Sequence, residues 1–214
     1  MRVGILGSGL MGGTLGTLFA RAGHEVVFSY ARSKEKLLQL ARKARARARA
    51  GTPWEAVRDA DAVLLAVHWS QLDAVLQKAG DLSGKPIVSC SLPMNDDNTS
   101  LVVAHRSSGA EVLARRVPKG SIVCAFNTVP SEVLRGIFKS REQAMRLSLV
   151  YCGDDTGSKR VAAELIRDVG FDPVDAGPLK MARYTEPFGL LVGQLAYDGG
   201  KGPELAYRFE WLRG

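Results

Sequence analysis

Short apolar runs alternate with amphipathic stretches along almost the whole chain. Apolar runs of about 4–8 residues between turn residues are typical of buried strands, whereas apolar residues that recur every third or fourth position are typical of helices. The pattern predicts strands over residues 2–7, 25–30, 62–67, 86–91, 121–126, 147–153 and 172–177. It predicts helices over residues 10–22, 34–44, 54–59, 71–78, 109–117, 131–138, 157–169 and 179–197, the last interrupted at Pro187.

A glycine-rich turn follows the first predicted strand, in the sequence GILGSGLMGG. Its glycines have the spacing G-x-G-x-x-G and open a helix, which is the context that a dinucleotide-binding turn requires. One glycine permits the tight turn, the next lets a pyrophosphate approach the backbone, and the third allows close helix-to-strand packing. We therefore predict that the pyrophosphate is bound by Gly7, Ser8, Gly9, Leu10, Met11 and Gly12.

The alternation together with this turn predicts an α/β protein with a Rossmann-type doubly wound parallel sheet and a small C-terminal α/β extension. We place the boundary after residue 145. Residues 1–145 would form the nucleotide-binding Rossmann domain, and residues 146–214 would form the extension that closes a cleft for a second substrate.

The second predicted strand ends without the acidic residue that usually binds the ribose hydroxyls of NAD. The residues there are Ser29, Tyr30, Ala31 and Arg32. A carboxylate would repel a 2′-phosphate, whereas a guanidinium pairs with one, so the sequence predicts NADP(H). We assign this pocket to Ser29, Tyr30, Arg32, Ser33 and Lys36. The alternative for the last two is a capped, charged helix start, and for Lys36 the two interpretations are equally weighted.

Three further strand ends carry polar or unusual residues, and in open α/β sheets the ligand lies outside the carboxyl ends of the strands. We expect them to form the wall of a nicotinamide site. The residues are Val67, His68, Trp69, Ser91, Asn127, Thr128 and Pro130. The alternatives are structural: a polar helix start and a packing aromatic at 68–69, and a capped turn with proline in the first helical turn at 127–130.

No side chain near these strand ends is a convincing general acid or base, so we expect no catalytic residue in that sense. Hydride transfer between a nicotinamide and a flavin-like ring depends on stacking and orientation instead. The sequence favours such an NADP-dependent oxidoreductase with a small-molecule redox substrate. It leaves open an NADPH-dependent reductase of a small carbonyl or imine compound, and an NADPH-binding module without turnover.

The formal net charge of +7 is concentrated in one segment. Five positive charges come from Arg42, Lys43, Arg45, Arg47 and Arg49, in an Ala/Arg alternation that we interpret as a solvated helix end or a mobile loop. Because no aromatic residues are interleaved, we expect no nucleic-acid binding.

The remaining composition favours a cytoplasmic protein with no membrane partner and no metal site. Apolar runs are far shorter than the roughly 20 residues of a membrane span. The N-terminus carries no signal-peptide pattern, and three cysteines beside predicted strands are expected as reduced thiols.

Several stretches together resemble one family: GSGLMGG, GHEVVFSYARS, FNTVPSEVL, YCGDDTGSKRVAAELIRDVGFDPVDAGPL and ARYTEPFGLLV. They resemble the NADP oxidoreductases that depend on the deazaflavin coenzyme F420, over nearly the whole chain. The block at residues 152–179 is the most specific and also resembles the cytosolic domain of the six-transmembrane metalloreductases.

The resemblance implies a second cofactor, coenzyme F420 or a flavin, stacked on the nicotinamide under a C-terminal lobe. It implies that residues 179–195 form the wall of that second site and a contact in a homodimer. It also matches Ser29, Arg32 and Ser33 to the family's 2′-phosphate site and residues 127–130 to the turn beside the nicotinamide.

Overall fold

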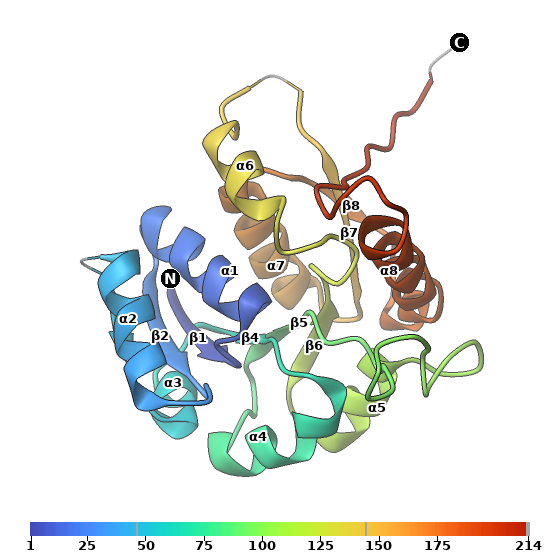
Figure 1. The fold of residues 1–214 in the computed structure, drawn as a ribbon. Coiled ribbons are helices and arrows are strands. Elements are labelled where there is room, and N and C mark those ends of the chain that lie inside the picture. Colours follow the sequence, from blue (N-terminus) through green and yellow to red (C-terminus); the bar gives the residue numbers. More distant parts are fainter. Residues whose placement is uncertain (46, 144, 213–214) are drawn as a thin grey trace.

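The computed structural model describes residues 1–45, 47–143 and 145–212. Within them, one eight-stranded sheet runs through the molecule with helices on both faces (Figure 1). The strand order is β3-β2-β1-β4-β5-β6-β7-β8, which confirms the Rossmann-type class. The strands are β1 (Arg2–Leu6), β2 (Glu25–Ser29), β3 (Ala48–Ala50), β4 (Ala62–Leu65), β5 (Pro86–Ser89), β6 (Ser121–Cys124), β7 (Ser148–Gly153) and β8 (Asp172–Asp175).

Two buried apolar clusters, one on each face, hold the helices to this sheet. The first packs α1 (Leu10–Arg21), α2 (Lys34–Ala44), α6 (Leu134–Lys139) and α7 (Thr156–Val169) against one face. The second packs α3 (Pro53–Arg58), α4 (Leu72–Ala79) and α5 (Gly109–Arg116) against the other. Short 3₁₀ turns at Trp69–Gln71 and Leu179–Met181 precede α4 and α8 (Ala182–Tyr197). No helix in the described part of the chain is long and apolar enough to cross a membrane.

Helix starts in this fold fall into two kinds. Ser33, Thr52, Ser108 and Asp155 each accept a hydrogen bond from a backbone N–H in the first turn of α2, α3, α5 and α7. Such caps satisfy amides that have no partner within the helix. The first turn of α1 follows Gly9 and has no side-chain cap. Its amides are therefore left for another acceptor.

The Ala/Arg segment corrects one expectation. Instead of a helix end or loop throughout, Ala48–Ala50 forms β3, which pairs in parallel with β2 at the sheet edge. Alternation has a period of two, so Ala48 packs against the first cluster while Arg49 projects from the other face. The central Ala46 of this segment lies outside the described residues.

Two further expectations are wrong in detail. The sheet is not parallel throughout, because β7 runs antiparallel to β6, with Cys124 opposite Cys152. A fully buried strand has the same apolar composition in either direction, so the pattern does not encode this. Helix α8 also continues through Pro187. Proline lacks one N–H and so removes one helical hydrogen bond, and the helix nevertheless runs unbroken from Ala182 to Tyr197.

Candidate functional site

The glycine-rich turn has the geometry that a dinucleotide requires. Gly7 adopts a φ of 103°, in the region that disfavours other residues. A Cβ at Gly12 would collide with the carbonyl oxygen of Gly7, so this glycine allows helix α1 to approach β1. By contrast, a Cβ at Gly9 would meet nothing within 4 Å. The turn is therefore closed on its protein side and open above Gly9.

Some backbone N–H groups at the turn donate to protein carbonyls, and others have no such partner in the described structure. The N–H groups of Gly7 and Ser8 donate to the carbonyls of Ser29 and Tyr30, at 3.2 and 3.1 Å. The first helical bond runs from Gly13 to Gly9, at 3.0 Å. Amides 10–12 thus lie in the uncapped first turn of α1, where a helix N-terminus favours an anion. Leu10 is 78% exposed beside them, which is unusual for a large apolar residue.

The hydroxyls of two serines assigned to the cofactor pocket bond the protein's own backbone. The hydroxyl of Ser29 donates to the carbonyl of Ile5 at 2.7 Å, and that of Ser8 donates to the carbonyl of Ser29 at 2.8 Å. Both residues are fully buried. They brace the strand ends β1 and β2, so neither side chain is available to a phosphate.

The exposed part of the 2′-phosphate candidate pocket is the start of α2. Arg32, Ser33 and Lys36 are all exposed there. The Ser33 hydroxyl accepts from the Lys36 N–H at 3.3 Å, as the alternative of a capped helix start predicts. Within the described residues, Arg32 makes no ion pair. Tyr30 adopts a left-handed φ of 55° and donates to Gln71 at 3.0 Å.

After β4, the predicted residues are mainly structural. The Ser91 hydroxyl donates to the carbonyl of Val67 at 2.7 Å and joins two strand ends, so this buried side chain is not free for a cofactor. Trp69 lies beside Arg116, whose guanidinium carbon is 5.8 Å from its ring centre. His68 caps the following turn and bonds Asn98 across 3.1 Å, which ties a distant loop to this edge.

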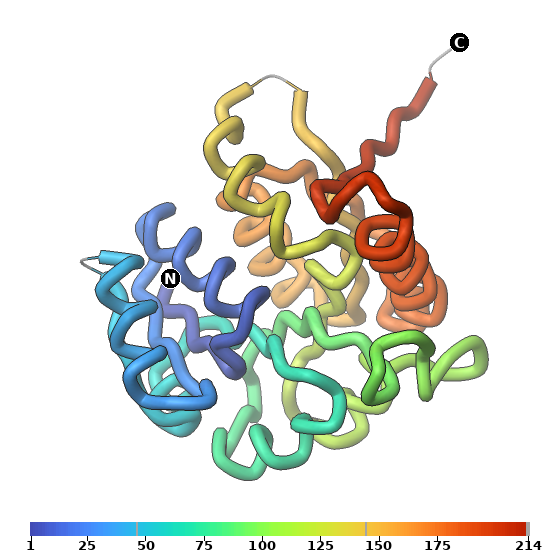
Figure 2. The backbone as a smooth tube through the Cα atoms, viewed as in Figure 1, coloured from blue at the N-terminus to red at the C-terminus, as the bar shows by residue number. Residues whose placement is uncertain are grey.

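A cavity of about 520 Å³ lies beside the carboxyl ends of β5 and β6. Its walls come from Met11 in α1, from the segments after β5 and β6, and from α8. Figure 2 shows the long green connection between β5 and α5 close to α8, and both line this cavity. The lining residues are Met11, Cys90, Leu92, Met94, Asp97, Asn98, Thr99, Phe126, Asn127, Val129, Pro130, Gly189, Leu190, Val192, Gly193, Gln194, Tyr197 and Asp198.

The turn after β6 is the most constrained part of this wall. Phe126 is fully buried with a left-handed φ of 62°, a conformation that is costly for a bulky residue and is found mainly at functional sites. The Asn127 amide donates to Cys124 Sγ at 3.1 Å, and within the described residues its Oδ1 has no hydrogen-bond partner. Buried Thr128 bonds the Tyr207 hydroxyl at 2.7 Å instead of facing the cavity.

Helix α8 is fixed over the cavity by charged groups at its first turns. The buried Glu186 carboxylate accepts from the N–H groups of Gly109 and Ala110, at 2.8 Å each, and so caps α5 from outside. Burial raises the pKa of Glu186 to about 7, although the two amide bonds act in the opposite direction. Arg183 donates two hydrogen bonds to Glu111, which holds the pKa of that carboxyl below its usual range.

Gly189 brings α8 close to the wall, since a Cβ there would collide with the Asn127 carbonyl. The sequence pattern did not predict the loop at 94–99, the capping role of Glu186 or the Tyr207 contact. The polar run NDDNTS was the only available signal for the first. Among the described residues, no group of three His, Cys, Asp or Glu side chains could hold a metal ion.

One family model matches the N-terminal part of this chain. Residues 2–93 match the family described as NADP oxidoreductase coenzyme F420-dependent. The matched segment contains the glycine turn, the start of α2 and the strand ends at residues 67 and 91, and the resemblance noted from the sequence is confirmed.

A curated relative, the metalloreductase STEAP3 of Rattus norvegicus, is 30% identical over 189 residues. The match covers 88% of this chain but only 36% of that protein, so the chain spans about a third of the relative's length.

Solved structures share the fold. A protein from Arthrobacter sp. FB24, named as a candidate F420-dependent NADP reductase, has a TM-score of 0.85 at 22% identity, covering 99% of this chain and 100% of that one. An imine reductase from Streptomyces aurantiacus has a TM-score of 0.67 at 19% identity, covering 93% of this chain and 64% of that one. At these identities the likeness concerns the fold alone.

Proposed function

We propose that this protein transfers hydride between NADP(H) and a flavin or deazaflavin ring. The cavity beside the uncapped start of α1 carries the proposal, because Met11 belongs to both. The open space above Gly9 suits a pyrophosphate, and the unpartnered Oδ1 of Asn127 suits a donor group on a bound ring. When bound, NADPH would supply a hydride, and the acceptor would take up that hydride with one proton from water.

In this proposal residues 1–145 hold the nucleotide and residues 146–214 close the second-substrate cleft through α8. Free amides at 10–12 and the exposed Arg32 bind phosphates, and the apolar lining around Leu92, Met94 and Leu190 excludes water from the reacting rings. Because no proton has to move at the reacting carbon of the nicotinamide, orientation by these walls accounts for the chemistry.

A second candidate is reduction of a small imine or carbonyl compound, favoured by Tyr197. Tyr197 is one of the residues that line the cavity, and its hydroxyl donates to Glu132 at 3.0 Å. Burial and the Glu132 carboxylate raise the pKa of Tyr197 to about 12, so the phenol is protonated at neutral pH.

The decisive experiment follows the oxidation of NADPH by oxidised coenzyme F420, riboflavin and a small cyclic imine, with NADH as the nucleotide control. NADPH-specific reduction of a flavin or deazaflavin that is unaffected by Tyr197→Phe supports the first function. Reduction of the imine alone, lowered about 100-fold by Tyr197→Phe, supports the second. Tight NADPH binding without oxidation by any acceptor would overturn both and leave a binding module.

A further inference from the structure

The chain after α8 returns to the start of β7 as an extended segment (Figure 1). We call residues 203–209 the C-terminal strap; they form neither helix nor strand. The Ser148 N–H donates to the Tyr207 carbonyl at 2.9 Å, and the Phe209 N–H donates to the Ser148 hydroxyl, also at 2.9 Å. Hydrogen bonds at Tyr207 and at Phe209 therefore hold the strap against β7.

The Tyr207 phenol points into the protein and joins two other segments. Its oxygen accepts from the Val150 N–H at 3.2 Å and lies 2.7 Å from the Thr128 hydroxyl oxygen. Because a backbone N–H can only donate, the phenol hydrogen remains available for Thr128. Burial raises the pKa of Tyr207, although these two bonds act in the opposite direction, so the phenol is protonated at neutral pH. One hydroxyl thus links β7 to the turn after β6.

The Tyr207 ring also contacts α8. Its centre lies 5.0 Å from the centre of the Phe188 ring, in an edge-to-face arrangement. The next residue, Gly189, lies against the Asn127 carbonyl, where a Cβ would collide. The turn after β6 and α8 are two walls of the 520 Å³ cavity, and Tyr207 contacts both without lining the cavity itself.

The turn that Tyr207 contacts is strained. Phe126 adopts a left-handed φ of 62°, and such a conformation persists only where the surrounding structure holds it. The Asn127 amide bonds Cys124, in the strand that leads into the turn, so this bond does not join the turn to another element. The fully buried Thr128 bonds Tyr207, which is 79 residues further along the chain. The phenol therefore ties the strained turn to the C-terminal strap.

We infer that Tyr207 is a positioning residue for hydride transfer: through Thr128 it fixes the turn after β6, and through Phe188 it fixes α8. The inference rests on the proposed function, because the acceptor ring would lie between these two walls. A displacement of about 1 Å can lower the rate of a reaction that depends on orientation by about 100-fold. The groups proposed to bind the phosphates of NADPH belong to other elements, α1 and α2, so nucleotide affinity should not depend on Tyr207.

Tyr207→Phe tests the role of the phenol, because it keeps the ring beside Phe188 and removes the bonds to Thr128 and Val150. At saturating NADPH we expect kcat for reduction of coenzyme F420 or riboflavin to fall about tenfold, while the KM for NADPH changes less than about twofold. Thr128→Val removes the other end of the same bond and should lower kcat to a similar extent. The double variant should lose no more than either single variant, because both changes break one contact.

Tyr151→Phe is the matched control. It removes another phenol of β7, one that lines a separate hollow beside α7, and should leave kcat unchanged. Each variant is assayed well below its own unfolding midpoint, and activity is expressed per folded enzyme. A lower midpoint in Tyr207→Phe with unchanged kcat would mean that the strap only stabilises the fold, and the inference would be overturned. Additive losses in the double variant would overturn the assignment to the Tyr207–Thr128 contact.

Hydrogen–deuterium exchange of the peptide that spans residues 126–130 separates this inference from the proposed function, because it requires no turnover. If the wild type reduces no acceptor, the proposed reaction is wrong, and exchange alone decides the role of the strap. Faster exchange in Tyr207→Phe than in the wild type and in Tyr151→Phe would support the fixing of the turn by the phenol. Equal exchange in all three proteins would overturn it.

Discussion

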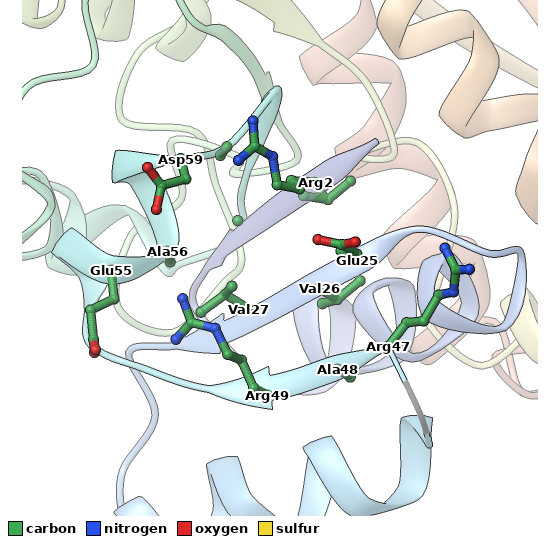
Figure 3. Close-up of a pocket in the computed structure, with 13 residues that line it drawn as sticks. Arg2, Glu25, Val26, Val27, Arg47, Ala48, Arg49, Glu55, Ala56 and Asp59 are labelled. Atoms are coloured by element: carbon green, nitrogen blue, oxygen red, sulfur yellow. The ribbon is translucent and has the colours of Figure 1, made fainter.

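Two cavities of similar size lie on opposite sides of the same sheet, one at the carboxyl ends of β5 and β6 and one at the amino ends of β1–β3. The cavity at the carboxyl edge is about 520 Å³, and one at the amino end of β1–β3, beneath α3, is about 450 Å³. Figure 3 shows arginine and carboxylate side chains interspersed around the second, which is lined by Arg2, Glu25, Arg47, Arg49, Glu55 and Asp59. We call them the carboxyl-edge cavity and the amino-edge cavity.

Four of the six charged side chains around the amino-edge cavity have protein partners: Arg2, Arg47, Glu55 and Asp59. Glu55 accepts from the N–H and hydroxyl of Thr52 and caps α3, and Arg47 donates to the Gly23 carbonyl. The carboxyl-edge cavity has instead an uncapped helix start, an unpartnered Asn127 oxygen and a strained Phe126 among its described residues. The volumes of the two cavities do not indicate which of them binds a ligand. The unsatisfied polar groups and the position at the carboxyl ends of the strands favour the carboxyl-edge cavity.

The largest effect is expected from Gly9→Val. A side chain there would occupy open space above the turn without a clash, so the fold should survive while the pyrophosphate is blocked. NADPH affinity, measured by titration of nucleotide fluorescence, should fall at least about 100-fold, which is about 2.7 kcal/mol. Gly136→Val, at an open position in α6, is the control and should leave affinity unchanged. Retained binding in Gly9→Val would place the pyrophosphate elsewhere.

Arg32→Ala and Arg49→Ala together test which edge of the sheet binds the nucleotide. Loss of a charged hydrogen bond should weaken NADPH binding by about 1.5 to 3 kcal/mol while NADH binding barely changes. Arg49→Ala removes an arginine from the amino-edge cavity and should affect neither nucleotide. Equal losses of NADPH and NADH affinity in Arg32→Ala would contradict NADP specificity. A larger loss of NADPH affinity in Arg49→Ala would place the nucleotide at the amino-edge cavity.

Gly193→Leu fills the carboxyl-edge cavity without disturbing its walls. A Cβ at Gly193 meets nothing within 4 Å, and leucine also favours the helix. We expect the rate of acceptor reduction to fall at least about tenfold, with NADPH affinity unchanged. Gly136→Leu serves as the helical control. An unchanged rate in Gly193→Leu would show that the acceptor binds outside this cavity.

Glu186→Gln should change how stability depends on pH. The pKa of about 7 in the folded protein exceeds that of an unfolded glutamate, so the folded state binds the proton more tightly and stability falls as pH rises towards 7. Between pH 5 and 8 the wild type should lose about 1 to 3 kcal/mol more than the variant, as measured by urea unfolding.

Glu55→Gln, at the amino-edge cavity, should change the pH dependence of stability in the opposite direction. Hydrogen bonds from Thr52 lower the pKa of Glu55, so its contribution is present at neutral pH and is lost as pH falls. The pH slope should therefore change in the opposite sense. Identical slopes in wild type and Glu186→Gln would mean that the buried carboxyl does not titrate in this range.

Local sequence determined most of the architecture. Apolar periodicity located every predicted strand and helix, because each element needs its own pattern to bury one face. The glycine spacing located the turn at residues 7–12. The positive φ at Gly7 and the close approach of α1 at Gly12 each require glycine at one particular position. The exposure of Arg32 follows from its place after β2 and before the capped start of α2, and its contact with a 2′-phosphate stays a prediction.

Only the tertiary structure decided what the side chains contact. Ser29, Ser91 and Thr128 stand where cofactor contacts were expected, but their hydroxyls bond atoms on other strands or on the C-terminal segment. The direction of β7 and the closure of the cavity by α8 likewise depend on residues far apart in the chain. A sequence pattern specifies which backbone each segment adopts. The partner of a buried polar group is set by which segments meet, and that is determined by the packing of the whole sheet.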